Sequence, residues 1–222
     1  RKLIGWDETI EGGLPPQATV MSWRGIEGGI EAATHGHDVV MSPGNTLYLD
    51  FLQTNLPDEP PGRPKFTSMQ KIYAFDPVPG QLQSEQRRHV IGVQANMWTE
   101  HTRTWERLQH NLFPRMAALA EIAWTPLQRK DYDGFLARLP VQLQRYRALG
   151  IAYGQTALSV AMQRQDDRAG NRVRVELSNP LGYGDIRYTT DGSVPTARSP
   201  AYTAPLDLAV PTELHAAAFF EG

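Results

Sequence analysis

The sequence predicts an α/β fold that holds half of a (β/α)8, or TIM, barrel, followed by a small, truncated all-β sandwich. Over residues 2–124, short apolar runs with polar or aromatic ends alternate with amphipathic patterns, as in a parallel sheet. A (β/α)8 barrel uses roughly 30 residues for each strand–helix unit, so four such units make half a barrel. After Gly150, short runs separated by turn residues indicate antiparallel strands.

These observations also predict where the two parts meet. We expect residues 1–150 to form the barrel half and residues 151–222 to form the sandwich. An immunoglobulin-sized sandwich needs about 100 residues, more than the chain has after Gly150. Half a barrel has two open edges, which are a liability in isolation. Because the chain begins at Arg1 without a start methionine or a signal peptide, we expect it to be a piece of a longer protein.

The elements follow in order along the first part. Gly36 is placed to end the first helix, Ser68 to cap a short one, and Pro114 to kink a long one or mark its start. Pro140 is unfavourable inside the last helix, because proline lacks the backbone N–H that a continuous helix uses. The expected strands cover residues 2–6, 18–23, 38–41 and 90–93, and the expected helices cover residues 25–35, 69–75, 105–124 and 131–149.

Two helices carry apolar stripes that should be buried. In the long helix we expect Trp105 and Trp124 to pack in the core. In the last helix the inner face is formed by Phe135, Leu139, Leu143 and Tyr146. The second part should contain strands over residues 172–178, 185–190, 202–208 and 213–219.

Composition excludes several functions. Hydrophobic residues make up 41% of the chain and charged residues 21%, as in an ordinary globular protein. The net charge of -2 gives no reason to expect a nucleic acid or a membrane as partner. The absence of cysteine excludes disulfides and thiolate catalysis. His35 and His37 lie at a helix end, no metal-binding motif is present, and we expect neither a metal nor another cofactor.

Polar and aromatic side chains at the strand ends point to a ligand site. Trp98 and Glu100 follow the strand over residues 90–93 and are two residues apart, so on an extended chain they share a face. Tyr48 and Asp50 have the same spacing. An aromatic face beside a carboxylate suits a sugar, which is apolar on its C–H face and polar around its rim. The other strands end at Trp6 and Trp23, and this repetition predicts a carbohydrate pocket.

The adjacent carboxyl groups of Asp7 and Glu8 are ambiguous by themselves. They could be catalytic, or they could form a cap or a salt bridge. Because neighbouring residues on a strand face opposite ways, both are not expected to enter one site directly.

Three segments resemble glycoside hydrolase family 20, the β-N-acetylhexosaminidases. They are IGWDETIEGGLPPQATVMSWRG, SPGNTLYLDF and IGVQANMWTEHTRTWERLQHNLFPRMAALAEIAWTP. The resemblance covers residues 1 to about 127 in unbroken motif order and implies strands five to eight of the barrel. A later segment, IRYTTDGSVPT, is similar to the C-terminal β-sandwich of bacterial chitobiase-type members.

The resemblance implies substrate-assisted retaining hydrolysis, in which the sugar's own 2-acetamido oxygen attacks its anomeric carbon. In the family an aspartate orients the acetamido group and the adjacent glutamate is the general acid and base. That pair lies on strand four, after a histidine- and glycine-rich run that this chain lacks. Asp7 and Glu8 match the strand-five motif instead, so we expect the catalytic pair upstream and the isolated chain to be inactive.

The resemblance also implies roles for single residues. Trp6, Trp23 and Trp98 resemble the three indoles that wall the acetamido pocket, and Trp98 also resembles the one that stacks on the sugar. Tyr48 resembles the catalytic tyrosine whose hydroxyl holds the acetamido oxygen in line for attack. We expect Trp98 to lie beside Trp6 only if the missing half of the barrel bridges them.

Asp50 and Glu100 resemble the carboxylates that grip the 4- and 6-hydroxyls, whereas the family's sugar-gripping arginine lies upstream. The expected partners are N-acetylhexosamine-terminated oligosaccharides, such as chitobiose or glycans. The missing N-terminal half, or a second copy, is expected to cover the open barrel edges. The family resemblance implies a periplasmic or secreted location. A non-catalytic carbohydrate-binding module, or a fragment without independent function, stays open as an alternative.

Overall fold

The computed structural model describes residues 2–167, 170–179, 181–182 and 184–219, and the chain divides into two compact units. One unit comprises Arg1–Tyr132 and Tyr146–Gly154. The other comprises Asp133–Arg145 and Gln155–Gly222. The predicted domain boundary between residues 150 and 151 stays a prediction.

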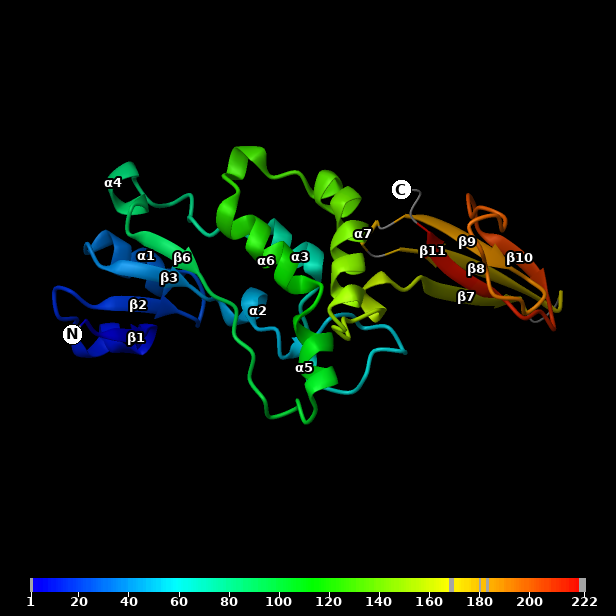
Figure 1. The fold of residues 1–222 in the computed structure, drawn as a ribbon, viewed down its shortest axis with the longest axis horizontal. Helices are drawn as coiled ribbons and strands as arrows, with labels where there is room; N and C mark the ends of the chain where they lie inside the picture. The colour runs from blue at the N-terminus through cyan, green and yellow to red at the C-terminus, as the bar shows by residue number, and fades with distance from the viewer. Residues whose placement is uncertain (1, 168–169, 180, 183, 220–222) are drawn as a thin grey trace. The chain divides into compact units, whose positions relative to one another are not determined.

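The first unit is built on a parallel sheet that confirms the four predicted strands (Figure 1). Its strands are β1 (Ile4–Trp6), β2 (Thr19–Ser22), β3 (Asp38–Met41) and β6 (Val90–Val93), in the order β1-β2-β3-β6. Every neighbouring pair is parallel, so the carboxyl ends of all four strands lie at one edge. Among the described residues, no further strand pairs with β1 or β6.

Helix α1 (Glu27–Thr34) packs its small residues against β2 and β3. Ala32 and Ala33 are buried with Val20, Val39 and Met41 in one apolar core. Gly36, with a φ of 82°, follows the helix, and its left-handed conformation ends it as predicted.

Among the described residues, no helix has both the length and the apolarity that a membrane crossing requires.

The remaining elements of the first unit are short. Ser68 caps one of them, α3, as predicted, and its Oγ accepts a hydrogen bond from the Lys71 N–H at 3.1 Å. These elements are η1 (Asp7–Gly12), α2 (Gly44–Leu47), β4 (Phe51–Leu52), β5 (Arg63–Phe66), α3 (Met69–Ala74), α4 (Ser84–Arg87), α5 (Trp105–Leu112), α6 (Arg115–Trp124) and η2 (Leu127–Arg129).

The long helix predicted over residues 105–124 is two helices. Pro114 separates α5 from α6, because proline lacks the N–H that a continuous helix needs at this position. The prediction that Trp105 and Trp124 pack in the core is wrong, since their exposed fractions are 67% and 88%. Trp105 begins α5 and Trp124 ends α6, so each lies at a helix end, outside the buried turn around Ala118 and Ile122.

Helix α7 (Tyr132–Ala148) runs through Pro140 without a break. The four residues predicted for its inner face are all buried: Phe135, Leu139, Leu143 and Tyr146. Their spacing of three or four residues places them on one side of the helix.

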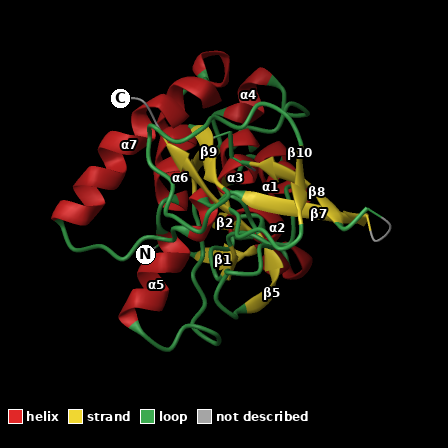
Figure 2. Ribbon diagram, turned by 90° about the vertical axis from the view of Figure 1, so that its right-hand side faces the viewer, coloured by secondary structure: helices red, strands yellow, loops and turns green. Residues whose placement is uncertain are grey.

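The second unit is antiparallel and contains the four strands predicted for it, with small shifts at their ends. One sheet has the order β10-β8-β7, formed by Leu206–Ala209, Arg172–Ser178 and Ala161–Asp167. β9 (Asp185–Thr189) pairs with β11 (His215–Phe219) in a second sheet. Figure 2 shows β7 beside β8. The sequence did not predict β7, whose side chains are mostly polar and exposed. η3 (Thr156–Leu158) precedes β7, and the truncation of the sandwich stays a prediction.

The buried cation Arg115 organises the chain after β3. The side chain of Arg115 is fully buried at the start of α6. Its Nη1 donates to the carbonyl oxygens of Phe51 at 3.0 Å and Thr67 at 2.9 Å, and its Nη2 donates to that of Leu49 at 2.5 Å. Its Nε donates to the Asn111 carbonyl at 3.0 Å. Burial lowers the pKa of Arg115 to about 9, so the group stays charged at neutral pH.

We predict that Arg115→Lys lowers the free energy of unfolding by about 3 kcal/mol, because an ammonium cannot reach carbonyls spread around a planar guanidinium. Chemical denaturation of the chain measures this loss. Arg88→Lys is the matched control, since Arg88 is exposed and pairs with Glu85 at the surface. If both variants lose the same small amount, Arg115 does not hold this segment.

Candidate functional site

The loops that follow β3 and β6 pair with each other beyond the sheet. Tyr48 and Asn96 form an isolated parallel bridge. The Leu49 N–H donates to the Asn96 carbonyl at 2.8 Å, and the Asn96 N–H donates to the Leu47 carbonyl at 3.0 Å. The Asn96 side chain also donates to Ser42 Oγ at 2.8 Å. This pairing fixes Tyr48 at the carboxyl end of the sheet.

The sequence suggested that Trp98 and Glu100 lie on an extended strand, but the structure places neither residue on a strand. β6 ends at Val93, and both residues belong to the loop that follows it. The strand argument for their common direction therefore does not apply, although both line the same cavity. Binding residues are often carried by loops at the carboxyl edge of a parallel sheet, because the sheet is a rigid scaffold that positions these loops.

Four aromatic rings from four separate segments lie together. Trp23 stacks on Tyr48 with ring centroids 6.3 Å apart and an interplanar angle of 19°. Trp98 lies 6.3 Å from Tyr48 and 6.3 Å from Trp6. The expectation that Trp6 and Trp98 meet only across the missing half of the barrel is wrong. Trp98 comes from the loop beyond β6, and this loop brings its indole to the ring at the end of β1.

These rings line an open cavity of about 350 Å³. This volume lies within the usual range for small-ligand sites. All predicted site residues line it except Asp50, and two residues that the sequence did not assign to the site also do so. The lining residues are Trp6, Glu8, Trp23, Tyr48, Arg63, Trp98 and Glu100.

Asp50 lies behind Arg63 rather than on the cavity wall. Its side chain is buried, and its Oδ2 accepts a hydrogen bond from Arg63 Nη1 at 2.7 Å. Its Oδ1 is also buried and has no hydrogen-bond partner among the described residues. Arg63 thus presents a guanidinium to the cavity with a carboxylate beneath it. No motif marked Arg63, because the sequence around it is rich in proline and shows no periodicity, although the structure places it at the start of β5.

Glu8 lines the cavity as a hydrogen-bond acceptor for an indole. Trp23 Nε1 donates to its two carboxylate oxygens at 3.1 and 2.9 Å. These hydrogen bonds hold the pKa of Glu8 below its usual value. The contact fixes the edge of the Trp23 ring. The sequence could not reveal it, because Glu8 and Trp23 are 15 residues apart in the chain.

Asp7 points elsewhere. Its carboxylate is buried and pairs with Arg24, whose Nε lies 3.0 Å from Oδ1. Burial raises the pKa of Asp7, and the hydrogen bonds and charge of Arg24 partly oppose this. Asp7 does not line the cavity, so the two adjacent carboxyl groups do not face one site together.

Tyr48 is the buried phenol among the cavity walls. Burial raises its pKa above the usual value, so the hydroxyl is neutral at physiological pH and can donate a hydrogen bond. In the described part of the chain, no group of three His, Asp or Glu side chains could hold a metal ion.

Comparison with known proteins identifies two segments. Residues 1–127 match the sequence profile described as "Glycosyl hydrolase family 20, catalytic domain". Residues 168–222 match the profile "Chitobiase/beta-hexosaminidase C-terminal domain". A β-hexosaminidase of Porphyromonas gingivalis is 40% identical over 215 residues, which are 94% of this chain and 27% of that protein. A β-N-acetylhexosaminidase of Cellulomonas fimi is 35% identical, over 63% of this chain and 28% of that protein.

Solved structures give the same relationship. A family 20 exo β-N-acetylglucosaminidase from Vibrio harveyi, in complex with N-acetylglucosamine, has a TM-score of 0.61 and 31% identity. The match covers 68% of this chain and 24% of that one. A family 20 β-N-acetylhexosaminidase from Streptomyces coelicolor has a TM-score of 0.61 and 27% identity, covering 69% of this chain and 32% of that one.

The chain thus spans between about a quarter and a third of the length of these relatives. Its parallel sheet is of the barrel type found in these structures, and the profile match extends over more than half of its residues. The chain belongs to glycosyl hydrolase family 20.

Proposed function

We propose that this chain forms the terminal-sugar pocket of an exo-acting β-N-acetylhexosaminidase. The whole protein would hydrolyse terminal non-reducing N-acetylhexosamine residues from chitobiose or glycans. The observation that carries the proposal is a cavity lined by three indoles and by Tyr48, whose hydroxyl can donate a hydrogen bond. Indole faces suit the acetamido methyl group and the C–H face of a sugar, and Glu100 offers an acceptor for its hydroxyls.

The chemistry proposed for the whole protein is the one that the family resemblance implies. The acetamido carbonyl oxygen attacks the anomeric carbon while the bond to the leaving oxygen breaks and that oxygen takes a proton from a general acid. The oxazolinium intermediate is then opened by water with retention. Tyr48 would hold the acetamido oxygen in line, and its hydrogen bond would strengthen as charge develops. Asp50 would act on the 4- and 6-hydroxyls through Arg63 or after a shift of that side chain.

The relatives support this substrate class. The Vibrio harveyi relative is named an exo β-N-acetylglucosaminidase and its structure holds N-acetylglucosamine. The Porphyromonas gingivalis relative is named a β-hexosaminidase. For the present chain we propose the same class of terminal sugar.

We propose that the rest of the whole protein supplies the catalytic Asp–Glu pair. The proposal includes a barrel half over residues 1–150 and a partial sandwich over residues 151–222. β1 and β6 are edge strands in the described chain, and Ile4 and Ile91 on them are exposed. The remaining barrel half, or a second copy, would cover these edges. A periplasmic or secreted location is proposed from the family resemblance.

A non-catalytic carbohydrate-binding module is the second candidate. The aromatic cavity is the observation behind it, since sugar binding needs the indoles but no acid pair. Calorimetry separates the two candidates. Binding of N-acetylglucosamine by the isolated chain, with no turnover by the whole protein, would establish the binding module.

We predict that the isolated 222-residue chain releases no product from a chromogenic N-acetylglucosaminide, whereas the whole protein does. The reason is that Glu8 is held ionised by an indole and Asp7 is outside the cavity. The assay compares equal concentrations of the two proteins. Significant turnover by the isolated chain would contradict the assignment of the acid to other residues.

We predict that Tyr48→Phe in the whole protein lowers kcat by roughly 10²–10³-fold, because a hydrogen bond to developing charge is lost. Steady-state kinetics on the same substrate measure the change. Tyr188→Phe, in the second unit, is the matched control and should leave kcat unchanged. A change in KM alone would show that Tyr48 only binds the sugar.

A further inference from the structure

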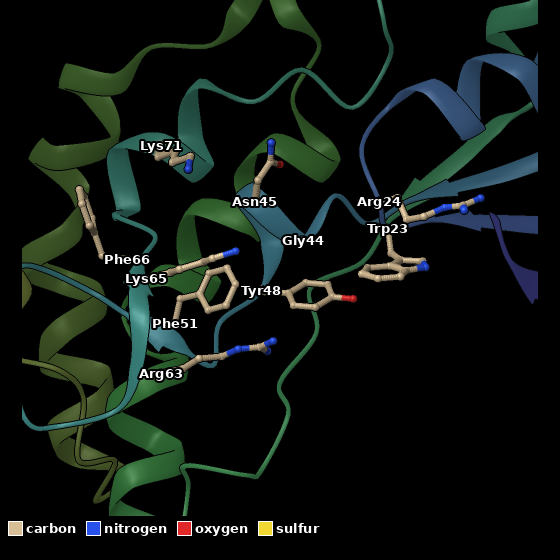
Figure 3. Close-up of a pocket in the computed structure, with 10 residues that line it drawn as sticks. All are labelled: Trp23, Arg24, Gly44, Asn45, Tyr48, Phe51, Arg63, Lys65, Phe66 and Lys71. Atoms are coloured by element: carbon tan, nitrogen blue, oxygen red, sulfur yellow. The ribbon is translucent and has the colours of Figure 1, made fainter. Parts of the chain in front are cut away.

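A second cavity adjoins the terminal-sugar pocket and has a different character. Its volume is about 510 Å³, and it shares Trp23, Tyr48 and Arg63 with that pocket (Figure 3). The two carboxylates of the first pocket, Glu8 and Glu100, do not line it, and every charged residue that the structure describes in its wall is a cation. These cations are Arg24, Arg63, Lys65 and Lys71. A cavity whose walls carry one charge attracts ligands of the opposite charge.

The two arginines of this wall are partly neutralised. Arg24 pairs with Asp7 and with Glu11, and Figure 3 shows its guanidinium pointing away from the lysines. Arg63 donates Nη1 to Asp50, and its other nitrogens have no hydrogen-bond partner among the described residues. Arg63 therefore keeps donors that a ligand can use.

The two lysines carry charge that the protein does not neutralise. Both side chains are exposed. In the part of the chain that the structure describes, the ammonium groups of Lys65 and Lys71 form no hydrogen bond or ion pair. The cavity thus has a net positive charge.

Phe51 holds Arg63 and Lys65 beside the boundary between the two cavities. The Arg63 guanidinium carbon lies 5.1 Å from the centre of the Phe51 ring, and Lys65 Nζ lies 5.6 Å from it. The Phe51 and Tyr48 rings are 6.0 Å apart, and in Figure 3 the charged ends of both cations extend toward Tyr48 on either side of Phe51. Cation–π contacts limit the positions of long side chains, so both cations stay near this boundary.

The position of C6 follows from the orientation already proposed for the terminal sugar. The proposed function places the 4- and 6-hydroxyls at Arg63, above Asp50, and the acetamido group at Tyr48. The pyranose ring agrees with this, because C5, which carries C6, lies across the ring from C2, which carries the acetamido group. Since Arg63 lines both cavities, a substituent on O6 can pass its guanidinium and enter the second cavity.

We propose that the second cavity binds an oxyanion ester, a sulfate or a phosphate, on O6 of the terminal N-acetylhexosamine. The inference rests on the proposed function and names a substrate class for it, terminal sugars with an anionic group at C6. The free nitrogens of Arg63 can donate to the oxygens of the ester, and Lys65 adds an ammonium group from the other side of Phe51. Asp50 occupies one nitrogen of Arg63, so the ester does not need to displace it.

The test measures kcat/KM of the whole protein on four chromogenic N-acetylglucosaminides. The sugar is unsubstituted, 6-O-sulfated, 6-O-phosphorylated or 4-O-sulfated. We expect kcat/KM for at least one 6-O-ester to exceed that for the unsubstituted sugar by about three- to tenfold, with the gain declining as ionic strength rises. The larger gain identifies which ester the cavity prefers. The 4-O-sulfate is the matched control, because it carries the same charge on another carbon, and it should show no gain.

Variants of Lys65 locate the effect. Lys65→Gln should lower the ratio of 6-O-ester to unsubstituted kcat/KM by about threefold, because an ammonium group beside the ester is lost. Lys65→Arg should restore the ratio. Lys2→Gln, at an exposed lysine outside both cavities, should leave it unchanged. Circular dichroism verifies that each variant is folded.

The outcomes separate this inference from the proposed function. Turnover of the unsubstituted sugar with equal or lower kcat/KM for both 6-O-esters overturns the inference and leaves the proposed function intact. An equal gain for the 4-O-sulfate overturns it as well, since the protein would then attract anions without a site at C6. A 6-O-ester preference that survives in Lys65→Gln also overturns it. Absence of turnover on all four substrates overturns both.

Discussion

The hydrogen bonds of the buried Arg115 guanidinium are the constraint on which the site depends. The segment after β3 is mostly turns, so its carbonyl groups lack the partners that a continuous strand or helix would provide. One planar cation supplies donors to Leu49, Phe51 and Thr67 at once. An isolated charge at this depth would be strongly unfavourable, and the ring of carbonyl dipoles offsets that cost. The backbone around Asp50 is thereby held without regular secondary structure.

This segment also positions Tyr48 within the group of four rings formed by Trp6, Trp23, Tyr48 and Trp98. Tyr48 directly precedes the backbone that Arg115 holds, and its bridge to Asn96 ties it to the loop that carries Trp98. Its ring then stacks on Trp23, whose N–H is fixed by Glu8. Trp23 and Tyr48 are thus positioned by polar contacts as well as by aromatic packing. Such polar support of the side chains is what a site with defined geometry requires.

The sequence predicted the parallel strands and most of the cavity wall, because both depend on local patterns. Apolar runs mark the strands, and residues after neighbouring parallel strands must meet at one edge. Arg63 and Arg115 could not be found in this way. Their roles arise from contacts with other segments of the chain, and an arginine in a proline-rich stretch or an amphipathic helix is ordinarily a surface residue. The exposure of Trp105 and Trp124 was missed for a related reason, since helix periodicity says nothing about where each helix ends.

Asp7 and Glu8 illustrate how surroundings decide what a carboxyl group can do. A general acid at neutral pH needs a raised pKa and a position facing the leaving group. Glu8 lies at the cavity, but the Trp23 hydrogen bonds favour its ionised form. Asp7 has the raised pKa, but it is buried against Arg24 and Gly28 outside the cavity. The two requirements are divided between adjacent residues and neither residue meets both. Glu8 therefore supports the Trp23 ring, and neither carboxyl group combines a raised pKa with a place on the cavity wall.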